Sequence, residues 1–258
     1  MTLDGTPPAR PADDHHTAHQ LAAAAGELLL EVRTRDFADA AARKAAGDAE
    51  SHRFLVEQLT AARPGDAVLS EEGADDPARS GSSRVWIVDP LDGTREFSEP
   101  DRTDWAVHVA LWARGELVAG AVALPAERTT VSTAEPPVVP ARADGPLRLA
   151  VSRSRPPALV QELGERLGAQ LVPMGSAGVK AMAVVRGVAD AYVHGGGQYE
   201  WDSAAPVAVA RAAGLHASRL DGSPLRYNRA DPWLPDLVIC RPELTDGLLA
   251  ALASTTRG

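Results

Sequence analysis

W-I-V-D-P-L-D-G-T-R-E-F, residues 86 to 97, is the stretch on which the rest of the chain depends. The apolar run Val85 to Val88 predicts a short buried strand that ends at Asp89. Pro90 fixes its own φ and lacks a backbone donor, so the strand should not simply continue through it. A proline at the second position of a four-residue turn folds Asp89 back toward Asp92, and the two carboxylates can then converge.

The residues that follow these two aspartates suit the binding of a phosphate. Gly93 lets the backbone come close to a ligand, and Thr94 supplies a hydroxyl where a helix could begin. Hard oxygen ligands beside a helix N-terminus are suited to holding a divalent metal and a phosphate together. An acidic surface turn is the alternative interpretation, because Asp, Pro and Gly are the ordinary residues of turns.

The composition is that of an acidic globular protein. Of the 258 residues, 45% are hydrophobic and 24% are charged, and a chain of this length can bury a full core in one compact unit of two lobes. The net charge of −9 argues against binding of a nucleic acid polymer, which relies on Lys and Arg. An acidic protein that acts on a phosphate needs local positive charge, and metal ions are the obvious source of it.

Three features of the sequence indicate a cytoplasmic location. No run of 18 apolar residues occurs, so we expect no membrane association, and the first residues do not have the pattern of a signal peptide. The single cysteine, Cys240, excludes an intrachain disulfide and fits a reducing compartment. Its position in the apolar run L-V-I-C predicts a buried small hydrophobe rather than a nucleophile.

Alternating strands and helices indicate an α/β fold with two lobes. Prolines and glycines in residues 134–146 mark the boundary between them. We expect a flexible N-terminus over residues 1–16, an N-terminal metal-binding α+β lobe over 17–140 and a C-terminal α/β lobe over 141–258, the two lobes forming one compact catalytic unit. The expected helices are 17–33, 48–62, 156–167, 179–186 and 202–213, and the expected strands are 67–69, 85–88, 105–112, 116–124, 129–133, 147–152, 171–174 and 189–193. Residues 195–197, three glycines, are expected to form a flexible loop.

Further acidic residues stand at the ends of these predicted elements. Glu71 and Glu72 follow the strand 67–69, and only one of them can point inward because neighbouring side chains alternate on an extended backbone. Asp48 and Asp202 each begin a predicted helix. Structural roles are the alternatives to metal binding, as solvated surface acids for the glutamates and as helix N-caps for the aspartates.

Three more motifs occur in the sequence besides D-P-L-D-G-T-R-E-F. They are L-S-E-E (69–72), G-S-A-G-V-K (175–180) and E-W-D-S-A-A (200–205). Together they resemble the magnesium-dependent, lithium-sensitive phosphatases that include inositol monophosphatase. The basic residue and Glu after D-G-T look most like the CysQ-type 3′(2′),5′-bisphosphate nucleotidases. The resemblance covers about residues 20 to 242 and implies an α/β (α+β) fold, a layered α-β-α-β-α sandwich.

The resemblance also implies two Mg²⁺ ions held by carboxylates from three distant segments, which are hard ligands suited to this ion. The implied ligands are Glu71, Asp89 and the Leu91 carbonyl for the first ion and Asp92 and Asp202 for the second, with Asp89 bridging. Asp48 is associated in the family with a third, weaker metal. Because the family's usual Thr three residues earlier is Ala45 here, an N-cap role for Asp48 stays open.

The resemblance gives catalytic roles to Glu71, Thr94 and Asp92. Glu71 and Thr94 would orient an attacking water and take up its proton, and the backbone amides of Gly93 and Thr94 would hold the phosphate oxygens. The remaining substrate-binding candidates are Arg95, Ser176, Lys180 and His194. Lys180 as a surface helix lysine and Arg95 as a solvated residue at a helix start are the alternatives.

From this resemblance we expect a phosphatase that removes the 3′-phosphate of 3′-phosphoadenosine 5′-phosphate to give AMP and phosphate, in sulfate assimilation. The alternatives are an inositol 1-phosphate or fructose 1,6-bisphosphate phosphatase, an enzyme with all three activities, and a non-catalytic metal-dependent binding protein. A haloacid-dehalogenase phosphatase is disfavoured, because its D-x-D-G-T motif has one residue between the aspartates where this chain has two. The expected partner is a small phosphorylated substrate, and a homodimer is left open.

Overall fold

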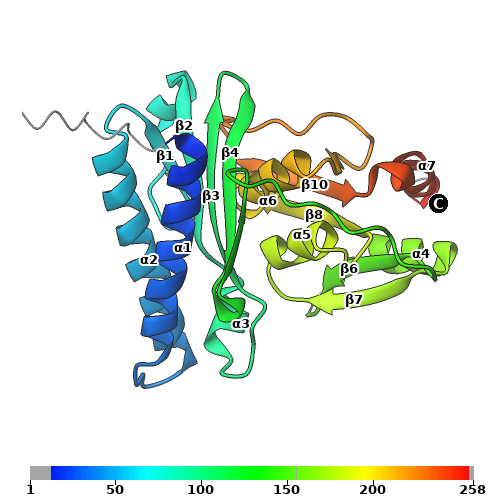
Figure 1. Ribbon diagram of the computed structural model, residues 1–258, viewed down its shortest axis with the longest axis horizontal. Helices are drawn as coiled ribbons and strands as arrows, with labels where there is room; N and C mark the ends of the chain where they lie inside the picture. The colour runs from blue at the N-terminus through cyan, green and yellow to red at the C-terminus, as the bar shows by residue number, and fades with distance from the viewer. Residues whose placement is uncertain (1–12, 155, 256–258) are drawn as a thin grey trace, which may run out of the picture.

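The computed structural model describes residues 13–154 and 156–255 and folds them into five alternating layers (Figure 1). Helices α1 (Asp14–Arg33) and α2 (Ala40–Ala62) form the first layer, and a five-stranded sheet forms the second. Helices α5 (Ala177–Val185) and α6 (Glu200–Ala212) lie between this sheet and a second five-stranded sheet. Helices α4 (Ala158–Leu167) and α7 (Thr245–Thr255) cover the far side. The expected α-β-α-β-α sandwich is thereby confirmed.

The first sheet has the strand order β1-β2-β3-β4-β5. Strand β1 pairs with β2 in parallel, and the other neighbours are antiparallel. Arg114 and Gly115 turn β3 into β4 with φ values of 53° and 96°, which suits a tight hairpin turn. The bounds are β1 (Ala67–Ser70), β2 (Arg84–Asp92), β3 (Ala106–Ala113), β4 (Glu116–Leu124) and β5 (Thr129–Ser132). All five strands fall where the sequence predicted them, although several boundaries differ by a few residues.

The second sheet has the order β7-β6-β8-β10-β9 and is mixed, with β6 parallel to β7 and β8. Its bounds are β6 (Arg148–Ser152), β7 (Gln170–Met174), β8 (Ala191–Tyr199), β9 (His216–Ser218) and β10 (Trp233–Cys240). Cys240 ends β10 and is fully buried, as the apolar run predicted. Burial raises the pKa of its thiol to about 11, so it stays neutral at physiological pH.

The three glycines of β8 correct the sequence analysis. Residues 195–197 were expected to form a flexible loop, but they continue β8 and pair with β10 through a register shift between Leu234 and Asp236. A Cβ on Gly197 would lie 1.7 Å from Trp233 Cζ2, so the indole packs directly on bare backbone. Close packing, rather than flexibility, therefore explains the glycine at position 197.

Helix α2 begins at Ala40, eight residues before the expected start at Asp48. Asp39 caps it, because its side chain accepts a hydrogen bond of 2.8 Å from the Ala42 amide. Asp48 therefore lies inside the helix, and the N-cap interpretation of this residue is wrong. The alanine-rich run before Asp48 has high helix propensity, which is why the helix extends backward.

One large apolar core joins the two sheets through α5 and α6. It contains Ile87 from β2, Val184 from α5 and Ile239 from β10, all fully buried. A second core lies between the first sheet and the outer helix pair, and it includes Trp86 and Leu29. The inner face of the first sheet is therefore covered by helices that come from the C-terminal half of the chain.

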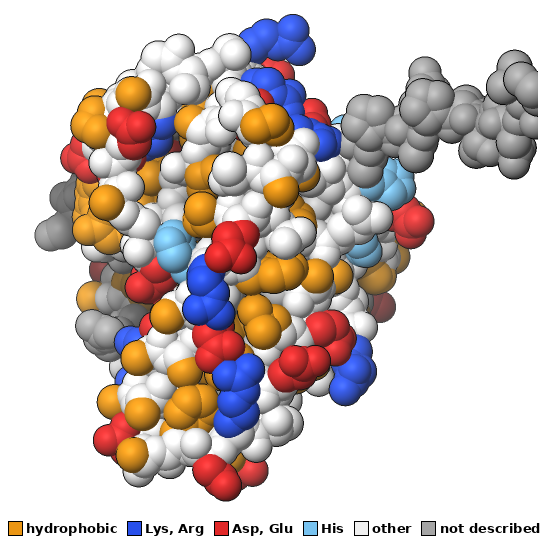
Figure 2. Space-filling view, turned by 90° about the vertical axis from the view of Figure 1, so that its left-hand side faces the viewer, with side chains coloured by type: hydrophobic (Ala, Val, Ile, Leu, Met, Phe, Trp, Pro, Cys, Tyr) orange, Lys and Arg blue, Asp and Glu red, His pale blue; other side chains and the backbone are white. Residues whose placement is uncertain are grey.

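The outer face formed by α1 and α2 carries acidic and basic side chains interspersed with small apolar patches (Figure 2). Charges of one sign do not gather on this face. None of the helices in the described part of the chain combines the length and the apolar character needed to cross a membrane.

Candidate active site

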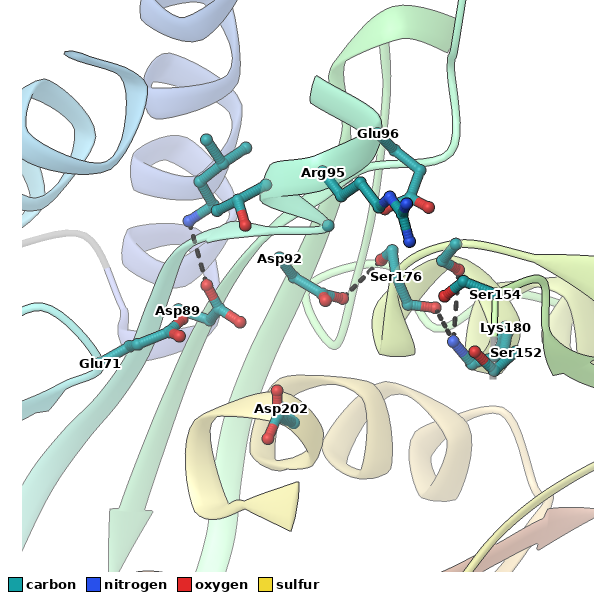
Figure 3. Close-up of a pocket in the computed structure, with 14 residues that line it drawn as sticks. Glu71, Asp89, Asp92, Arg95, Glu96, Ser152, Ser154, Ser176, Lys180 and Asp202 are labelled. Carbon is teal, nitrogen blue, oxygen red and sulfur yellow. Dashed lines mark hydrogen bonds between the residues drawn. The ribbon is translucent and has the colours of Figure 1, made fainter. Parts of the chain in front are cut away.

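A cavity of about 240 Å³ lies where β2 and α3 (Thr94–Ser98) meet the turn before α5 and the start of α6 (Figure 3). It brings together residues from both halves of the chain. Its walls are Glu71, Asp89, Leu91, Asp92, Gly93, Thr94, Arg95, Glu96, Ser152, Ser154, Gly175, Ser176, Lys180 and Asp202. All five implied ligands for two metal ions are therefore in one cavity, although their distances in sequence are large.

The aspartate turn is built by a local break in strand pairing. Asp89 pairs with His108 and Asp92 pairs with Ala106, with a register shift between them, so β2 continues to Asp92 and the expected end at Asp89 is wrong. Pro90 interrupts the pairing without ending it. The Asp89 carboxylate accepts a 3.0 Å hydrogen bond from the Leu91 amide, which closes a tight Asx-type turn.

Helix α2 fixes the other side of this turn. Ser51, buried in α2, donates a 2.7 Å hydrogen bond to the Pro90 carbonyl. Gly93 follows in the left-handed region with φ 84°, and a Cβ there would lie 3.2 Å from the Trp105 Cα and the Asp104 carbonyl oxygen. Only glycine fits this conformation without strain. The backbone amides at 93 and 94 are thereby held at the cavity wall.

Asp92 is the most heavily hydrogen-bonded carboxylate of the site. Its Oδ2 accepts hydrogen bonds from the Ser176 hydroxyl at 2.5 Å and the Gly178 amide at 2.7 Å, and His108 Nε2 lies 3.2 Å away. Burial disfavours its charge, but His108, Ser176 and Lys180 outweigh that effect and lower the pKa of Asp92. Asp92 is therefore the ionised anchor of the cluster.

The other carboxylates of the cluster lack such compensation. Glu71 is an exposed residue by surface area, but the surroundings of its carboxylate and the nearby Asp202 raise its pKa to about 7. Burial and Asp92 raise the pKa of Asp202 to about 6, and burial with Glu71 holds that of Asp89 well above its usual range. Burial together with like charges that lack a counter-ion produces these raised pKa values, and a divalent cation would relieve the repulsion. The residues present therefore fit a metal ion.

His108 is a site residue that the sequence analysis missed. It is fully buried in β3, and one ring nitrogen lies within 4.8 Å of carboxylate oxygens of both Asp89 and Asp92, a group able to hold a metal ion. Its Nδ1 lies 3.0 Å from the Trp201 carbonyl of α6. The signal was a lone histidine in the apolar strand W-A-V-H-V-A-L-W.

Lys180 is buried, so its interpretation as a surface lysine is wrong. Its ammonium donates hydrogen bonds to the Ser176 carbonyl at 2.6 Å and the Gly175 carbonyl at 3.3 Å. Burial lowers its pKa against the opposing effect of Asp92. Ser176 adopts φ 49° as the N-cap of α5, which aims its hydroxyl at Asp92. Positive charge is thereby fixed beside the carboxylate cluster.

The remaining predicted site residues lie farther out. Arg95 is exposed at the cavity rim, where its guanidinium lies 3.6 Å from Glu99. His194 lies in an adjoining cavity and its Nε2 is 2.8 Å from the Gly197 carbonyl oxygen. Asp48 is half-buried outside the walls of the first cavity, and burial with the nearby Glu72 raises its pKa to about 6.

Asp202 also caps helix α6. Its carboxylate accepts a 2.6 Å hydrogen bond from the Tyr199 amide, although it stands at the third helical position rather than at the N-cap. Asp202 therefore does stabilise the start of the helix, as the alternative interpretation expected, but from inside the helix. The same side chain also lines the cavity. One carboxylate oxygen satisfies the helix start while the residue remains at the site.

Comparison with known proteins places these features in a family. Residues 12–257 match the model of the inositol monophosphatase family. The chain is 55% identical over 242 residues to the 3′-phosphoadenosine 5′-phosphate phosphatase of Mycobacterium tuberculosis, covering 90% of this chain and 91% of that protein. It is 31% identical over 234 residues to the 3′(2′),5′-bisphosphate nucleotidase CysQ of Escherichia coli, covering 83% and 94%. CysQ from Bacteroides thetaiotaomicron has a similar structure, with a TM-score of 0.79 at 27% identity over 88% of this chain and 97% of that one.

Proposed function

The chain belongs to the inositol monophosphatase family and is similar both to a 3′-phosphoadenosine 5′-phosphate phosphatase and to CysQ nucleotidases. We therefore propose that it hydrolyses the 3′-phosphate of 3′-phosphoadenosine 5′-phosphate to AMP and phosphate. The observation that carries this proposal is the 55% identity, along nine-tenths of the chain, to a phosphatase of that substrate. Four carboxylates line one cavity, and they support metal-assisted hydrolysis of a phosphate independently of the similarity to that relative.

We assign the metal to this carboxylate cluster as Mg²⁺, held by Glu71, Asp89, Asp92, Asp202 and the Leu91 carbonyl. When bound, the metal supplies positive charge that activates water and neutralises the phosphate. A third ion near Asp48 remains part of the proposal. Activity should vanish in chelator and return with added Mg²⁺, and lithium should inhibit turnover. Appreciable turnover without metal would contradict the assignment.

The protein residues then divide the reaction between them. Thr94 and Glu71 orient the attacking water, and Glu71 takes up its proton as the new phosphorus–oxygen bond forms. The amides of Gly93 and Thr94 donate to the phosphate oxygens. The bond between phosphorus and the 3′-oxygen breaks, the 3′-oxygen takes a proton from solvent water and leaves as a hydroxyl, and Glu71 returns its proton to solvent. No covalent phospho-enzyme is formed.

Inositol 1-phosphate and fructose 1,6-bisphosphate are the competing substrates, because metal-assisted hydrolysis depends on contacts with the phosphate more than on contacts with the rest of the molecule. The buried ammonium of Lys180 and the adjoining cavity favour a substrate with a second anionic group and a bulky organic part. The test compares kcat/KM for the three substrates on one preparation. A tenfold advantage for either sugar-type substrate, about 1.4 kcal/mol of transition-state preference, would overturn the nucleotidase proposal.

We further propose a cytoplasmic enzyme of sulfate assimilation that acts on small phosphorylated molecules. The single cysteine and the net charge of −9 support this setting, since they fit a reducing compartment and disfavour nucleic acid polymers. Assembly as a homodimer stays a prediction, which sedimentation of the purified protein would decide.

A further inference from the structure

One side chain holds the segment that begins with Glu71 to the rest of the molecule. Residues 71–83 leave β1, form the short 3₁₀-helix η1 (Pro77–Gly81) and lead into β2. Among these residues, all of which the structure describes, Arg79 is the only buried one, and it is 1% exposed. A guanidinium leaves water only where opposite charge and hydrogen bonds compensate it. The partners of Arg79 therefore show what holds this segment in place.

Arg79 joins its own segment to a loop from the other half of the chain. Its Nε and Nη2 donate hydrogen bonds to the two carboxylate oxygens of Asp75 at 2.5 and 2.9 Å. This bidentate pair fixes the plane of the guanidinium. The remaining terminal nitrogen, Nη1, donates to the side-chain oxygen of Asn228 at 2.9 Å. Arg79 therefore ties the segment after β1 to the loop before β10.

Asn228 is itself fixed by the first residue of α6. The backbone amides of Asn228 and Arg229 donate to the two carboxylate oxygens of Glu200 at 2.7 and 2.9 Å, and Glu200 is fully buried. The Glu200 amide donates to the Pro232 carbonyl at 2.9 Å, so both ends of the loop 228–232 contact the start of α6. Asn228 adopts φ 58°, a conformation that asparagine tolerates better than most residues. The start of α6 thereby presents the Asn228 side chain to Arg79.

The two ends of this chain of contacts lie beside two assigned metal ligands. Asp75 comes four residues after Glu71, and Asp202 comes two residues after Glu200 in the first turn of α6. Glu71 stands at the start of a segment that is otherwise exposed or half-buried, so its position depends on where that segment is anchored. The anchor at Arg79 connects Glu71 to the helix that carries Asp202.

We propose that Arg79 is a positioning residue, which acts through Asn228 and Glu200 to hold Glu71 in place relative to Asp202 and thereby raises the affinity of the site for Mg²⁺. This inference rests on the proposed function for the identity of the metal. Ligands that are already held in place lose less conformational freedom when an ion binds, so the ion binds more tightly. Arg79 does not line the active-site cavity, and it therefore acts through other residues rather than on the substrate.

Two variants break the contact from opposite sides. Arg79→Met keeps most of the side-chain length and removes the charge and the donors. Asn228→Gly removes the acceptor and leaves a residue that adopts φ 58° without strain. Arg241→Met is the matched control, because Arg241 is also buried, lies 3.4 Å from the buried Asp190 and lines neither cavity of the site. Isothermal titration calorimetry measures the Kd for Mg²⁺, and amide hydrogen exchange measures the opening of residues 71–83.

Both variants should weaken Mg²⁺ binding roughly 10-fold, the lower end of the loss expected for an outer partner of a metal ligand. Amides of residues 71–83 should exchange faster, and kcat at saturating Mg²⁺ should stay within about threefold of that of the natural enzyme, because the chemical groups remain. The double variant should bind Mg²⁺ no more weakly than either single variant, since both remove the same contact. Arg241→Met should lower the melting temperature, because it leaves a buried charge without one partner, and keep the natural Kd.

Three outcomes would overturn the inference. If both variants bind Mg²⁺ as tightly as the natural enzyme, Arg79 has a purely structural role, while the proposed function stands. If Arg241→Met weakens Mg²⁺ binding as much as they do, the loss reflects general stability. If the natural enzyme neither binds Mg²⁺ nor hydrolyses the nucleotide, the proposed function and this inference fail together. Should Arg79→Met not fold, Asn228→Gly alone decides, because it removes an uncharged partner and leaves the Arg79–Asp75 pair intact.

Discussion

Asp92 is the residue at which the two halves of the chain meet. It ends β2, yet its donors Ser176 and Gly178 come from the start of α5, more than 80 residues later. His108 adds a third contact from β3. A Cβ on Gly178 would lie 2.1 Å from His108 Nε2, so the histidine and the α5 backbone are packed directly together. The position of this carboxylate thus depends on three elements at once.

Asp92→Asn should abolish nearly all phosphatase activity and leave the fold intact. The amide keeps the shape of the side chain but removes the charge that a metal ion needs. Loss of a residue that only hydrogen-bonds to a metal ligand costs up to about 100-fold. Asp92 is assigned as a ligand itself, so we expect a loss of more than about 100-fold. Asp144→Asn, at an exposed position, is the control and should be fully active. An active Asp92→Asn enzyme with unchanged circular dichroism would place the metal site elsewhere.

The raised pKa values of Glu71, about 7, and Asp202, about 6, predict a linkage between pH and metal binding. Unfolded carboxylic acids titrate near pH 4, so between about pH 4 and 7 these two groups bind more protons in the metal-free folded protein than in the unfolded chain. The contribution of these two carboxylates to stability in chelator should therefore fall as pH rises through this window. Added Mg²⁺ needs the ionised carboxylates and should raise the melting temperature more at about pH 8 than at about pH 5.5. Equal shifts at both values would contradict the assignment of the metal to these residues.

The sequence was informative about residues whose chemistry is visible locally. Asp89 and Asp92 could be singled out because a proline and a glycine frame them, and the resemblance added Glu71 and Asp202. His108 was missed, because a single polar residue in an apolar strand shows its role only when the facing elements are known. The burial of Lys180 was missed for the same reason, since helix periodicity does not show which neighbours cover a helix.

At the scale of the elements, errors came from residues that allow two structures. The alanine run before Asp48 fits a helix or a linker by composition, and it became part of α2 because Asp39 supplies a cap. The glycines of β8 fit a loop or a strand, and pairing with β10 decided for the strand. Strands with alternating or continuous apolar residues, such as β3 and β4, were predicted well because burial of their side chains leaves few alternatives.

Gly120 tests the contact between the first sheet and α6. A Cβ at this position would lie 2.6 Å from the Ala208 Cβ and 3.2 Å from the Ala205 carbonyl, so β4 and α6 would have to separate. Gly120→Ala should therefore lower the free energy of unfolding by about 1–3 kcal/mol, as overpacking does. Gly81→Ala is the matched control, with no atom within 4 Å of the new methyl, and should stay within about 0.5 kcal/mol. Urea denaturation of both variants measures the difference, and equal stabilities would show that β4 and α6 can adjust to the methyl group.

At the scale of the whole molecule, the two predicted lobes share their interior. Helix α6 packs against β2, β3 and β4 of the first sheet as well as against strands of the second. Asp202 reaches the site from this same helix. At the expected boundary, residues 134–146, the chain passes from the first sheet to the second. The apolar core does not divide there, because residues from both halves of the chain form one cluster.

We therefore predict that the protein unfolds in a single cooperative step and that residues 17–140 alone do not fold. Cutting the chain after residue 140 would remove α5 and α6 and expose the inner face of the first sheet, including Ile87 and Val122, to water. Apolar area of this kind contributes about 25 cal/mol per Å² when buried, so its exposure should cost the fragment its stability and cause aggregation. Calorimetry of the metal-free full chain should show one transition whose calorimetric and van't Hoff enthalpies agree. Two resolved transitions, or a soluble fragment 17–140 with native-like amide protection, would mean that the lobes fold independently and that the metal site forms only when they dock.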